Sequence, residues 1–211
     1  MLEFPGGVYA ITPETADTER LLAQVEAALT GGVAAVQYRD KSADVGRRHE
    51  QASELVALCR RFGIPLIVND DLRLADLTDA DGVHLGRDDG SLREARIILG
   101  KNKFIGASCY QSLELALAAQ AGGADYVAFG SFFASPTKPA APRASVDLLR
   151  EAAPLIQLPL VAIGGITLAN AAQLLDGGAD CLAVLSALFD APDIGASAHD
   201  LNQLFEVESE Q

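Results

Sequence analysis

Eight short apolar runs alternate along the chain with longer segments in which apolar residues recur at the three- and four-residue spacing of a helix. Three of these helical segments read RLLAQVEAAL, LELALAAQA and LANAAQLL. Short runs rich in Val, Ala, Leu and Ile are typical of strands buried on both faces of a parallel sheet. The pattern therefore predicts eight strands separated by helices, at residues 8–11, 34–38, 66–68, 82–85, 104–107, 126–129, 160–163 and 181–185.

One phrase occurs three times, as TGGVAAVQYRD, AGGADYVAFGS and DGGADCLAVLS. In each copy a glycine pair follows a helical segment and precedes an apolar run, as expected where a helix ends and a parallel strand begins. Eight strands alternating with helices, with no block rich in strands or in helices and no linker rich in Ser, Pro or Gly, predict an α/β protein that forms a single (β/α)8 barrel. We expect one domain over residues 1–211, with a polar tail from about residue 206.

A doubly wound open sheet is the main alternative to the barrel. Such a sheet is expected to carry a phosphate-binding G-x-G-x-x-G motif after its first strand. The corresponding segment of this chain, VYAITPET, contains no glycine. The first strand and its loop therefore favour the barrel.

The acidic composition narrows the possible partners. The chain has 29 Asp and Glu against 16 Lys and Arg, for a formal net charge of -13. Nucleic acids and anionic membranes bind surfaces with an excess of cations, so we expect neither partner.

The cysteines and the N-terminus bear on the cellular compartment. The three cysteines show no C-x-x-C spacing, the N-terminus lacks the features of a signal peptide, and no apolar run reaches about 18 residues. These features favour a protein of the reducing cytoplasm.

Acidic residues follow two neighbouring predicted strands. In a barrel of this type, catalytic residues lie at the carboxyl ends of the strands and in the loops that follow. Asp70 follows the third strand and Asp89 follows the fourth, so we expect both carboxylates to reach one cation. Two carboxylates completed by water and phosphate oxygens are a usual Mg²⁺ site. The alternative role for these acids, and for the adjacent Asp71 and Asp88, is to cap the helices that follow.

Basic residues follow the second and sixth predicted strands, as Arg39, Lys41 and Lys138. Each alone could be a solvated loop charge. Together with a two-carboxylate metal site they indicate a pyrophosphate-binding site, in which Mg²⁺ and the cations share the anionic oxygens. The segments AIGGIT and VLSAL indicate a second phosphate site after strands seven and eight, because Gly164 and Gly165 let the backbone approach a ligand closely. A simple tight turn is the alternative there.

The segments VYAIT, QYRDK, NDD, GVHLGRDDGS, IGAS, DYVAFGSFFASPTK, VAIGGI and LAVLSALF occur in this order. In this combination the chain resembles the thiamine-phosphate synthase family, from about Val8 to Phe189. The resemblance implies a Mg²⁺-dependent transferase of thiamine biosynthesis with two small-molecule substrates. It would join 4-amino-2-methyl-5-(diphosphooxymethyl)pyrimidine to 4-methyl-5-(2-phosphooxyethyl)thiazole and release pyrophosphate. The implied reaction is dissociative: the C–O bond to pyrophosphate breaks, and the thiazole nitrogen captures the pyrimidine-methyl cation.

The resemblance also implies roles for individual residues. It assigns the pyrimidine diphosphate to Gln37, Tyr38, Arg39, Asp40, Lys41, Asn69, Ser108 and Lys138, Mg²⁺ to Asp70 and Asp89, and the thiazole phosphate to Ser135, Pro136, Thr137, Gly165, Leu185 and Ser186. The residues expected to be catalytic are Arg39, Lys41, Lys138 and Ser108.

The chain departs from the family pattern at a few positions. The family usually has Thr where this chain has Ser135, and it often has Pro where this chain has Ser131. A histidine is more common at the position of Tyr110, whose role stays open. His84, inside the fourth predicted strand, is interpreted as a packed or hydrogen-bonded histidine.

Two alternative functions stay open on this scaffold. A thiazole tautomerase-like barrel would need a histidine acid/base in the loop after the sixth strand, where this chain has Ser131. A non-catalytic regulator would bind phosphate ligands without releasing pyrophosphate. Retention of both metal-binding carboxylates favours the synthase over the tautomerase.

Overall fold

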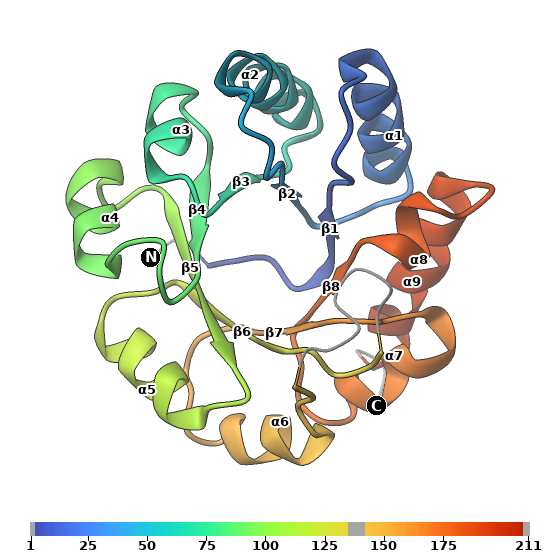
Figure 1. The fold of residues 1–211 in the computed structure, drawn as a ribbon. Helices are drawn as coiled ribbons and strands as arrows, with labels where there is room; N and C mark the ends of the chain where they lie inside the picture. The colour runs from blue at the N-terminus through green and yellow to red at the C-terminus, as the bar shows by residue number, and fades with distance from the viewer. Residues whose placement is uncertain (1–2, 135–141, 209–211) are drawn as a thin grey trace.

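The computed structural model describes residues 3–134 and 142–208, and it shows eight parallel strands closed into a barrel with helices around it (Figure 1). The strands pair in chain order, and β1 closes the barrel against β8. They are β1 (Gly7–Ile11), β2 (Ala35–Tyr38), β3 (Leu66–Asn69), β4 (Gly82–Leu85), β5 (Phe104–Tyr110), β6 (Tyr126–Gly130), β7 (Leu160–Ile163) and β8 (Cys181–Val184). The predicted (β/α)8 fold is confirmed, and only β5 extends more than one residue beyond its predicted bounds.

Helices follow each strand and form the outer ring in Figure 1. They are α1 (Thr18–Thr30), α2 (Val45–Phe62), α3 (Leu72–Leu77), α4 (Leu92–Leu99), α5 (Leu113–Ala121), α6 (Val146–Ala152), α7 (Leu168–Leu175), α8 (Ser186–Phe189) and α9 (Ile194–Glu208). Helix α9 runs past residue 206, where the sequence suggested a tail. Asp71 caps α3 by accepting a hydrogen bond from the Leu74 backbone N–H, whereas α4 is capped by Ser91 and not by Asp88.

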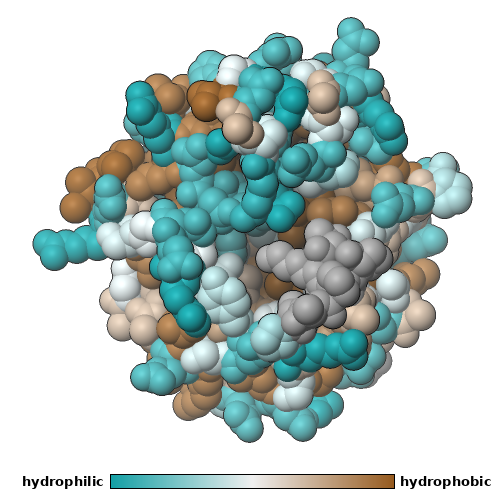
Figure 2. Space-filling model, in the orientation of Figure 1, coloured by the Kyte–Doolittle hydropathy of each residue, from teal (hydrophilic) through white to brown (hydrophobic). Residues whose placement is uncertain are grey.

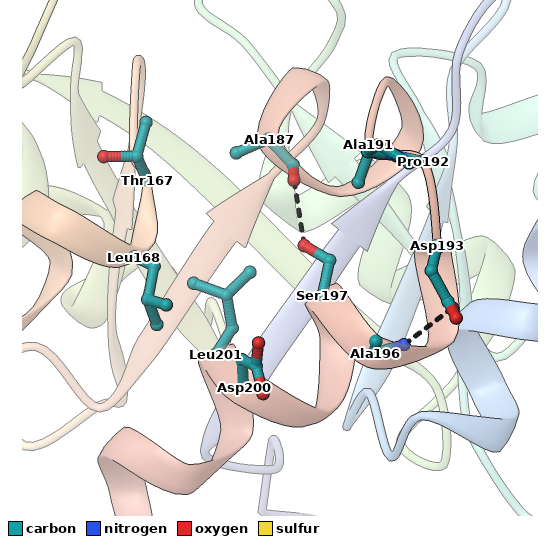
Figure 3. A pocket seen from close by; sticks show the side chains of 10 residues that line it. All are labelled: Thr167, Leu168, Ala187, Ala191, Pro192, Asp193, Ala196, Ser197, Asp200 and Leu201. Carbon is teal, nitrogen blue, oxygen red and sulfur yellow. Dashed lines mark hydrogen bonds between the residues drawn. The ribbon is translucent and has the colours of Figure 1, made fainter.

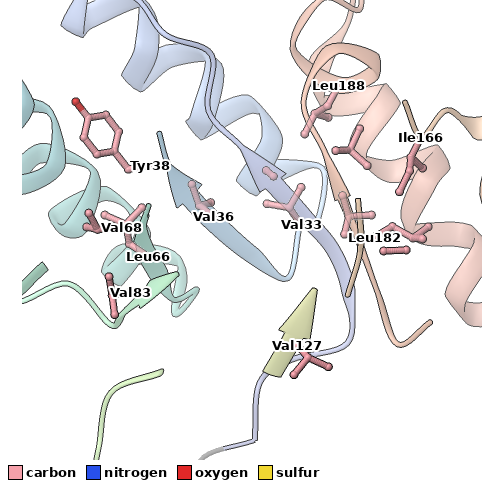
Figure 4. Close-up of a cluster of buried hydrophobic side chains, with 14 of the residues drawn as sticks. Val33, Val36, Tyr38, Leu66, Val68, Val83, Val127, Ile166, Leu182 and Leu188 are labelled. Atoms are coloured by element: carbon pink, nitrogen blue, oxygen red, sulfur yellow. The ribbon is translucent and has the colours of Figure 1, made fainter. Parts of the chain in front are cut away.

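Side chains alternate along each strand between the barrel interior and the helices. The outward layer packs against the helices, and Figure 4 shows part of it, including Val36, Tyr38 and Leu182. The inward layer comprises Phe4, Tyr9, Ile11, Ala35, Ile67, Phe104, Tyr126, Ala128, Val161, Cys181 and Ala183. Because aromatic rings fill this interior at the end where the strands begin, space for a ligand remains only toward their carboxyl ends.

The repeated Gly-Gly phrase has a structural basis at the amino ends of the strands. In two of its copies an aspartate directly precedes the strand, two residues after the glycine pair, and an equivalent aspartate precedes β4. Carboxylates of Asp81, Asp125 and Asp180 accept hydrogen bonds from the backbone N–H groups of Leu66, Ile105 and Leu160 at 3.0, 2.7 and 2.7 Å, respectively. Each carboxylate therefore ties its own strand to the start of a neighbouring strand.

The cysteines Cys59, Cys109 and Cys181 are buried free thiols. Among the helices of the two described ranges, none combines the length and the apolar character that crossing a bilayer requires.

Candidate active site

A cavity of about 710 Å³ opens at the carboxyl ends of the strands, and residues from all eight strands line it. Figure 2 shows this face of the molecule with a hollow at its centre, bordered by hydrophilic side chains. The residues expected from the sequence that line the cavity are Gln37, Arg39, Lys41, Asn69, Asp70, Asp89, Ser108, Gly165, Leu185 and Ser186. Four other candidates, Ser135, Pro136, Thr137 and Lys138, lie outside the described residues.

The segment from Gln37 to Lys41 divides its side chains between the cavity and the outer layer. Gln37, Arg39 and Lys41 line the cavity, as every second residue of a strand would. Tyr38 instead donates a hydrogen bond from its hydroxyl to Gln51 Oε1 on α2 at 2.9 Å. Asp40 points the same way, and its side chain is only 1% exposed. The structure therefore turns Tyr38 and Asp40 away from the cavity, although the resemblance assigned both to the substrate.

A cluster of charges stands on the wall formed by β2, β3 and β4. Lys41 Nζ lies 2.9 Å from Asp70 Oδ2, and the Asp89 carboxyl lies close enough to Asp70 to affect its pKa. Burial raises the pKa of Asp70, but the contacts with Lys41 and Asp89 outweigh it and hold that pKa below its ordinary value. The pKa of Asp89 is raised, by burial and by the Asp70 charge beside it. Ionisation of Asp70 thus disfavours ionisation of Asp89. A cation between the two carboxyl groups would relieve this repulsion.

The donor set of this wall suits Mg²⁺. Among the described residues, no group of three or more His, Cys, Asp or Glu side chains is arranged to hold a metal ion. Mg²⁺ does not need such a group, because it keeps several waters and takes its remaining oxygens from one or two carboxylates and from substrate phosphates. Asp70 and Asp89, facing a cavity with room for a phosphate, fit that requirement.

The loop after β4 holds Asp89 in place. The Gly86 backbone N–H donates to Asp89 Oδ2 at 2.9 Å, and a Cβ added at Gly86 would lie only 2.6 Å from the same oxygen. Tyr110, from the end of β5, accepts a hydrogen bond on its hydroxyl from the Arg87 backbone N–H at 3.3 Å. The Arg87 guanidinium also lies over the Tyr110 ring, 5.2 Å from its centroid. Through these two contacts with Arg87, Tyr110 stabilises the loop that carries Asp89, a candidate metal ligand.

Polar side chains also cross the barrel interior beneath the cavity. The Tyr9 hydroxyl lies 2.9 Å from the Tyr126 hydroxyl, and Gln37 Nε2 donates to Tyr9 Oη at 2.9 Å. His84 lies between Tyr126 Oη, 3.0 Å from Nδ1, and Ser108 Oγ, 2.8 Å from Nε2. Burial lowers the pKa of His84 to about 4, more than the nearby Asp70 raises it, so the imidazole is neutral at neutral pH. Sequence reasoning missed Tyr9 and Tyr126, although their inward strand positions were a usable signal.

The opposite wall is built by the loops after β7 and β8. Gly165 has a φ of 65°, and a Cβ there would overlap the Ala134 carbonyl oxygen. Asn170 Nδ2 donates to the Gly165 carbonyl at 3.0 Å, which fixes the turn. Leu185 and Ser186, at the start of α8, line the cavity beside it. This wall presents backbone groups and the hydroxyls of Thr167 and Ser186, without a carboxylate among its described lining residues.

A second, smaller hollow of about 430 Å³ lies between α7, α8 and α9 (Figure 3). It shares Thr167 and Ala187 with the main cavity. Its charged lining residues are Asp193 and Asp200, and the Asp193 carboxylate is engaged by the Ala196 backbone N–H at 2.9 Å. Because its charged lining is acidic, this hollow does not suit a phosphate, and the main cavity is the candidate active site.

Comparisons with known proteins agree with this geometry. Residues 8–188 match the sequence profile of thiamine monophosphate synthase. The chain is 75% identical over 211 residues to the thiamine-phosphate synthase of Thiobacillus denitrificans, covering 100% of each chain. It is 55% identical over 199 residues to the thiamine-phosphate synthase of Methylobacillus flagellatus, covering 94% of this chain and 95% of that protein.

Solved structures give the same result. The thiamine phosphate pyrophosphorylase from Pyrococcus furiosus superposes with a TM-score of 0.85 at 36% identity, covering 95% of this chain and 96% of that one. A 3-hexulose-6-phosphate synthase superposes with a TM-score of 0.68 at 17% identity, which shows a shared barrel fold alone. The sequence profile, the identities and the barrel with its charged cavity together establish that this chain belongs to the thiamine monophosphate synthase family.

Proposed function

We propose that the chain is a thiamine-phosphate synthase that joins a pyrimidine methyl diphosphate to a thiazole phosphate and releases pyrophosphate. The observation that carries this proposal is the placement of Arg39, Lys41, Asp70 and Asp89 on one wall of a single cavity. Cations and paired carboxylates on one wall complement a metal-bound diphosphate. The volume of the cavity, about 710 Å³, falls within the usual range for a small-molecule site.

The diphosphate would lie against this charged wall. Arg39 offers a guanidinium whose planar N–H groups match phosphate oxygens, and Lys41 offers a point charge. Lys138, which the resemblance adds to this group, lies outside the described residues. Asp70 and Asp89 would hold Mg²⁺, which when bound neutralises charge on the phosphate oxygens. The thiazole phosphate would lie against the opposite wall, near Gly165 and Ser186.

The residues of the cavity favour a dissociative substitution. The C–O bond between the pyrimidine methylene and the diphosphate breaks first, and both bonding electrons leave with pyrophosphate. Arg39 and Lys41 stabilise the charge that grows on this leaving group, because they are already placed before the bond breaks. The thiazole nitrogen then donates its lone pair to the methylene carbon and forms the new C–N bond. No proton is transferred in either step, so the protein needs no general base.

One assay tests the proposal against its alternatives. The purified chain, incubated with both substrates and Mg²⁺, is expected to form thiamine phosphate and pyrophosphate in equal amounts. Arg39→Ala is expected to lower kcat/KM by about 10²–10³-fold, as loss of a transition-state donor does. Arg61→Ala is the matched control, because Arg61 lies on the outer surface of α2 with a side chain 66% exposed.

Three results would contradict the synthase proposal. Isomerisation of a thiazole precursor without the pyrimidine substrate would identify a tautomerase. Binding of both phosphates without release of pyrophosphate would identify a regulator. Equal activity of Arg39→Ala and Arg61→Ala would refute the role of the charged wall.

A further inference from the structure

A chain of four hydrogen bonds crosses the barrel interior and reaches the cavity at both ends. It runs from Gln37 Nε2 to the Tyr9 hydroxyl, then to the Tyr126 hydroxyl, then to His84 Nδ1, and from His84 Nε2 to Ser108 Oγ. All four bonds are 2.8 to 3.0 Å long. Gln37, Tyr9, His84 and Ser108 line the cavity, and the Tyr9 and Tyr126 side chains are almost fully buried.

The first bond sets the direction of every other bond in the chain. The Gln37 amide N–H can only donate, so the Tyr9 oxygen accepts. Tyr9 then places its own hydrogen on Tyr126, and Tyr126 places its hydrogen on His84 Nδ1. A neutral imidazole has one N–H, which in this arrangement is on Nε2. His84 therefore donates to Ser108 Oγ and leaves the hydroxyl hydrogen of Ser108 unused.

The reverse direction would leave a hydrogen without an acceptor. If Ser108 donated to His84 and His84 donated to Tyr126, Tyr126 would donate to Tyr9, whose oxygen would then accept from both sides. In the described part of the chain, the partners of the Tyr9 hydroxyl are Gln37 and Tyr126 alone. Tyr9 is only 1% exposed, and its hydroxyl hydrogen has no further acceptor among the described side chains. An unpaired buried donor is costly, and the first direction avoids it.

We propose that His84 is a positioning residue that acts through Ser108. It holds the Ser108 oxygen as an acceptor, so that the Ser108 hydroxyl can present its hydrogen to a hydrogen-bond acceptor of the substrate in the cavity. This inference rests on the proposed function for the identity of that substrate, a pyrimidine diphosphate. The orientation of the hydrogen bonds does not depend on it.

The direction of the chain can be measured in the free protein. Nitrogen-15 NMR of the histidine rings distinguishes a nitrogen that carries hydrogen from one that does not. The chain has three histidines, and His49 and His199 are exposed, so a His84→Gln variant assigns the buried ring. We expect hydrogen on Nε2 of His84 and none on Nδ1. Hydrogen on Nδ1 would reverse the chain and overturn the proposal.

Kinetics of paired variants test the consequence for Ser108. His84→Gln can still place an amide N–H near Ser108, whereas His84→Asn is too short to reach it. We expect His84→Asn to lower kcat/KM for the pyrimidine diphosphate about tenfold more than His84→Gln, the effect of one lost hydrogen bond. We also expect His84→Asn to have no further effect in a Ser108→Ala background. Equal effects of both His84 variants, or additive effects with Ser108→Ala, would contradict the positioning role.

A packing control separates hydrogen bonding from repacking of the interior. Tyr126→Phe removes the hydroxyl that donates to His84, and we expect it to mix the His84 tautomers and to lower kcat/KM. Phe4→Leu removes a ring stacked on Tyr126 at 4.0 Å but no hydrogen bond of the chain. We expect it to lower the melting temperature and to leave the tautomer and kcat/KM unchanged. Equal kinetic effects of the two variants would refute the proposal. If the wild-type protein forms no thiamine phosphate, the proposed function fails, but the tautomer measurement still decides the direction of the chain.

Discussion

Replacing Asp40 distinguishes a structural role from a substrate-binding role. The resemblance assigns Asp40 to the pyrimidine diphosphate, but its carboxylate accepts a hydrogen bond from the Ser42 backbone N–H at 2.6 Å and lies 3.4 Å from Arg47 Nη2. Its side chain is 1% exposed and does not line the cavity. We predict that Asp40→Asn and Asp40→Ala lower the free energy of unfolding, and that Asp40→Asn leaves KM for the pyrimidine diphosphate unchanged.

The size of the effect follows from the two contacts. A buried hydrogen bond to a charged group contributes about 1.5–3 kcal/mol, and a partly exposed ion pair adds at most about 1 kcal/mol. Asp40→Ala is therefore expected to cost about 2–4 kcal/mol, or a fall of about 5–15 °C in the melting temperature of a protein of this size. Asp40→Asn keeps an acceptor for the Ser42 N–H, so its cost is expected to be about half as large.

The pH dependence of the effect has a definite sign. Burial raises the pKa of Asp40, but hydrogen bonds from Ser42 and the Arg47 charge lower it further than burial raises it. The ionised carboxylate thus stabilises the folded protein above the unfolded-state pKa of about 3.9, and this stabilisation is lost as the pH falls through the lower folded-state pKa. The stability difference between wild type and Asp40→Asn should therefore begin to shrink as the pH falls below about 3.9.

Urea denaturation of wild type and both variants, at neutral pH and at about pH 3, measures these differences. Steady-state kinetics at neutral pH gives KM for the pyrimidine diphosphate. A large rise of KM in Asp40→Asn with an unchanged free energy of unfolding would refute the structural role. It would support the substrate-binding role that the resemblance assigns to Asp40.

Three further predictions concern tightly fitted positions. Gly86→Ala places a Cβ against the Asp89 carboxylate, so Mn²⁺ binding, followed by electron paramagnetic resonance as a substitute for Mg²⁺, is expected to weaken about tenfold with little change in stability; unchanged binding would contradict the role of that loop. Gly106→Ala overlaps the Tyr126 ring and is expected to destabilise the barrel by about 1–3 kcal/mol in thermal denaturation. Arg96→Ala removes donors to three backbone carbonyls and a carboxylate, and is expected to cost about 2–4 kcal/mol in urea denaturation with kcat unchanged; a change in kcat at full stability would count against it.

The local pattern of the sequence was enough to predict the barrel. Each unit of strand and helix is predicted by its own apolar run and its helical spacing, and three of the units also by a glycine pair, because these signals act over a few neighbouring residues. The position of the charged wall could also be predicted, since carboxyl ends of parallel strands must meet on one face. Arg39, Lys41, Asp70 and Asp89 accordingly line one cavity.

Other features depend on contacts between distant strands. The bond between Tyr9 and Tyr126 joins residues 117 positions apart, and no local pattern signals it. The inward or outward direction of Tyr38 and Asp40 follows from strand alternation, yet the resemblance treated the whole segment from 37 to 41 as one binding unit. Only the closed barrel shows that these two side chains pack toward α2 while their neighbours face the cavity.

The sequence by itself thus determined the order of the elements and the face on which the chemistry lies, because periodicity and strand polarity are local properties. The tertiary structure decided which side chains form hydrogen bonds with one another, which carboxylates repel each other and which polar groups are buried. Those properties depend on distances across the barrel, and closing the barrel sets these distances through the register of all eight strands.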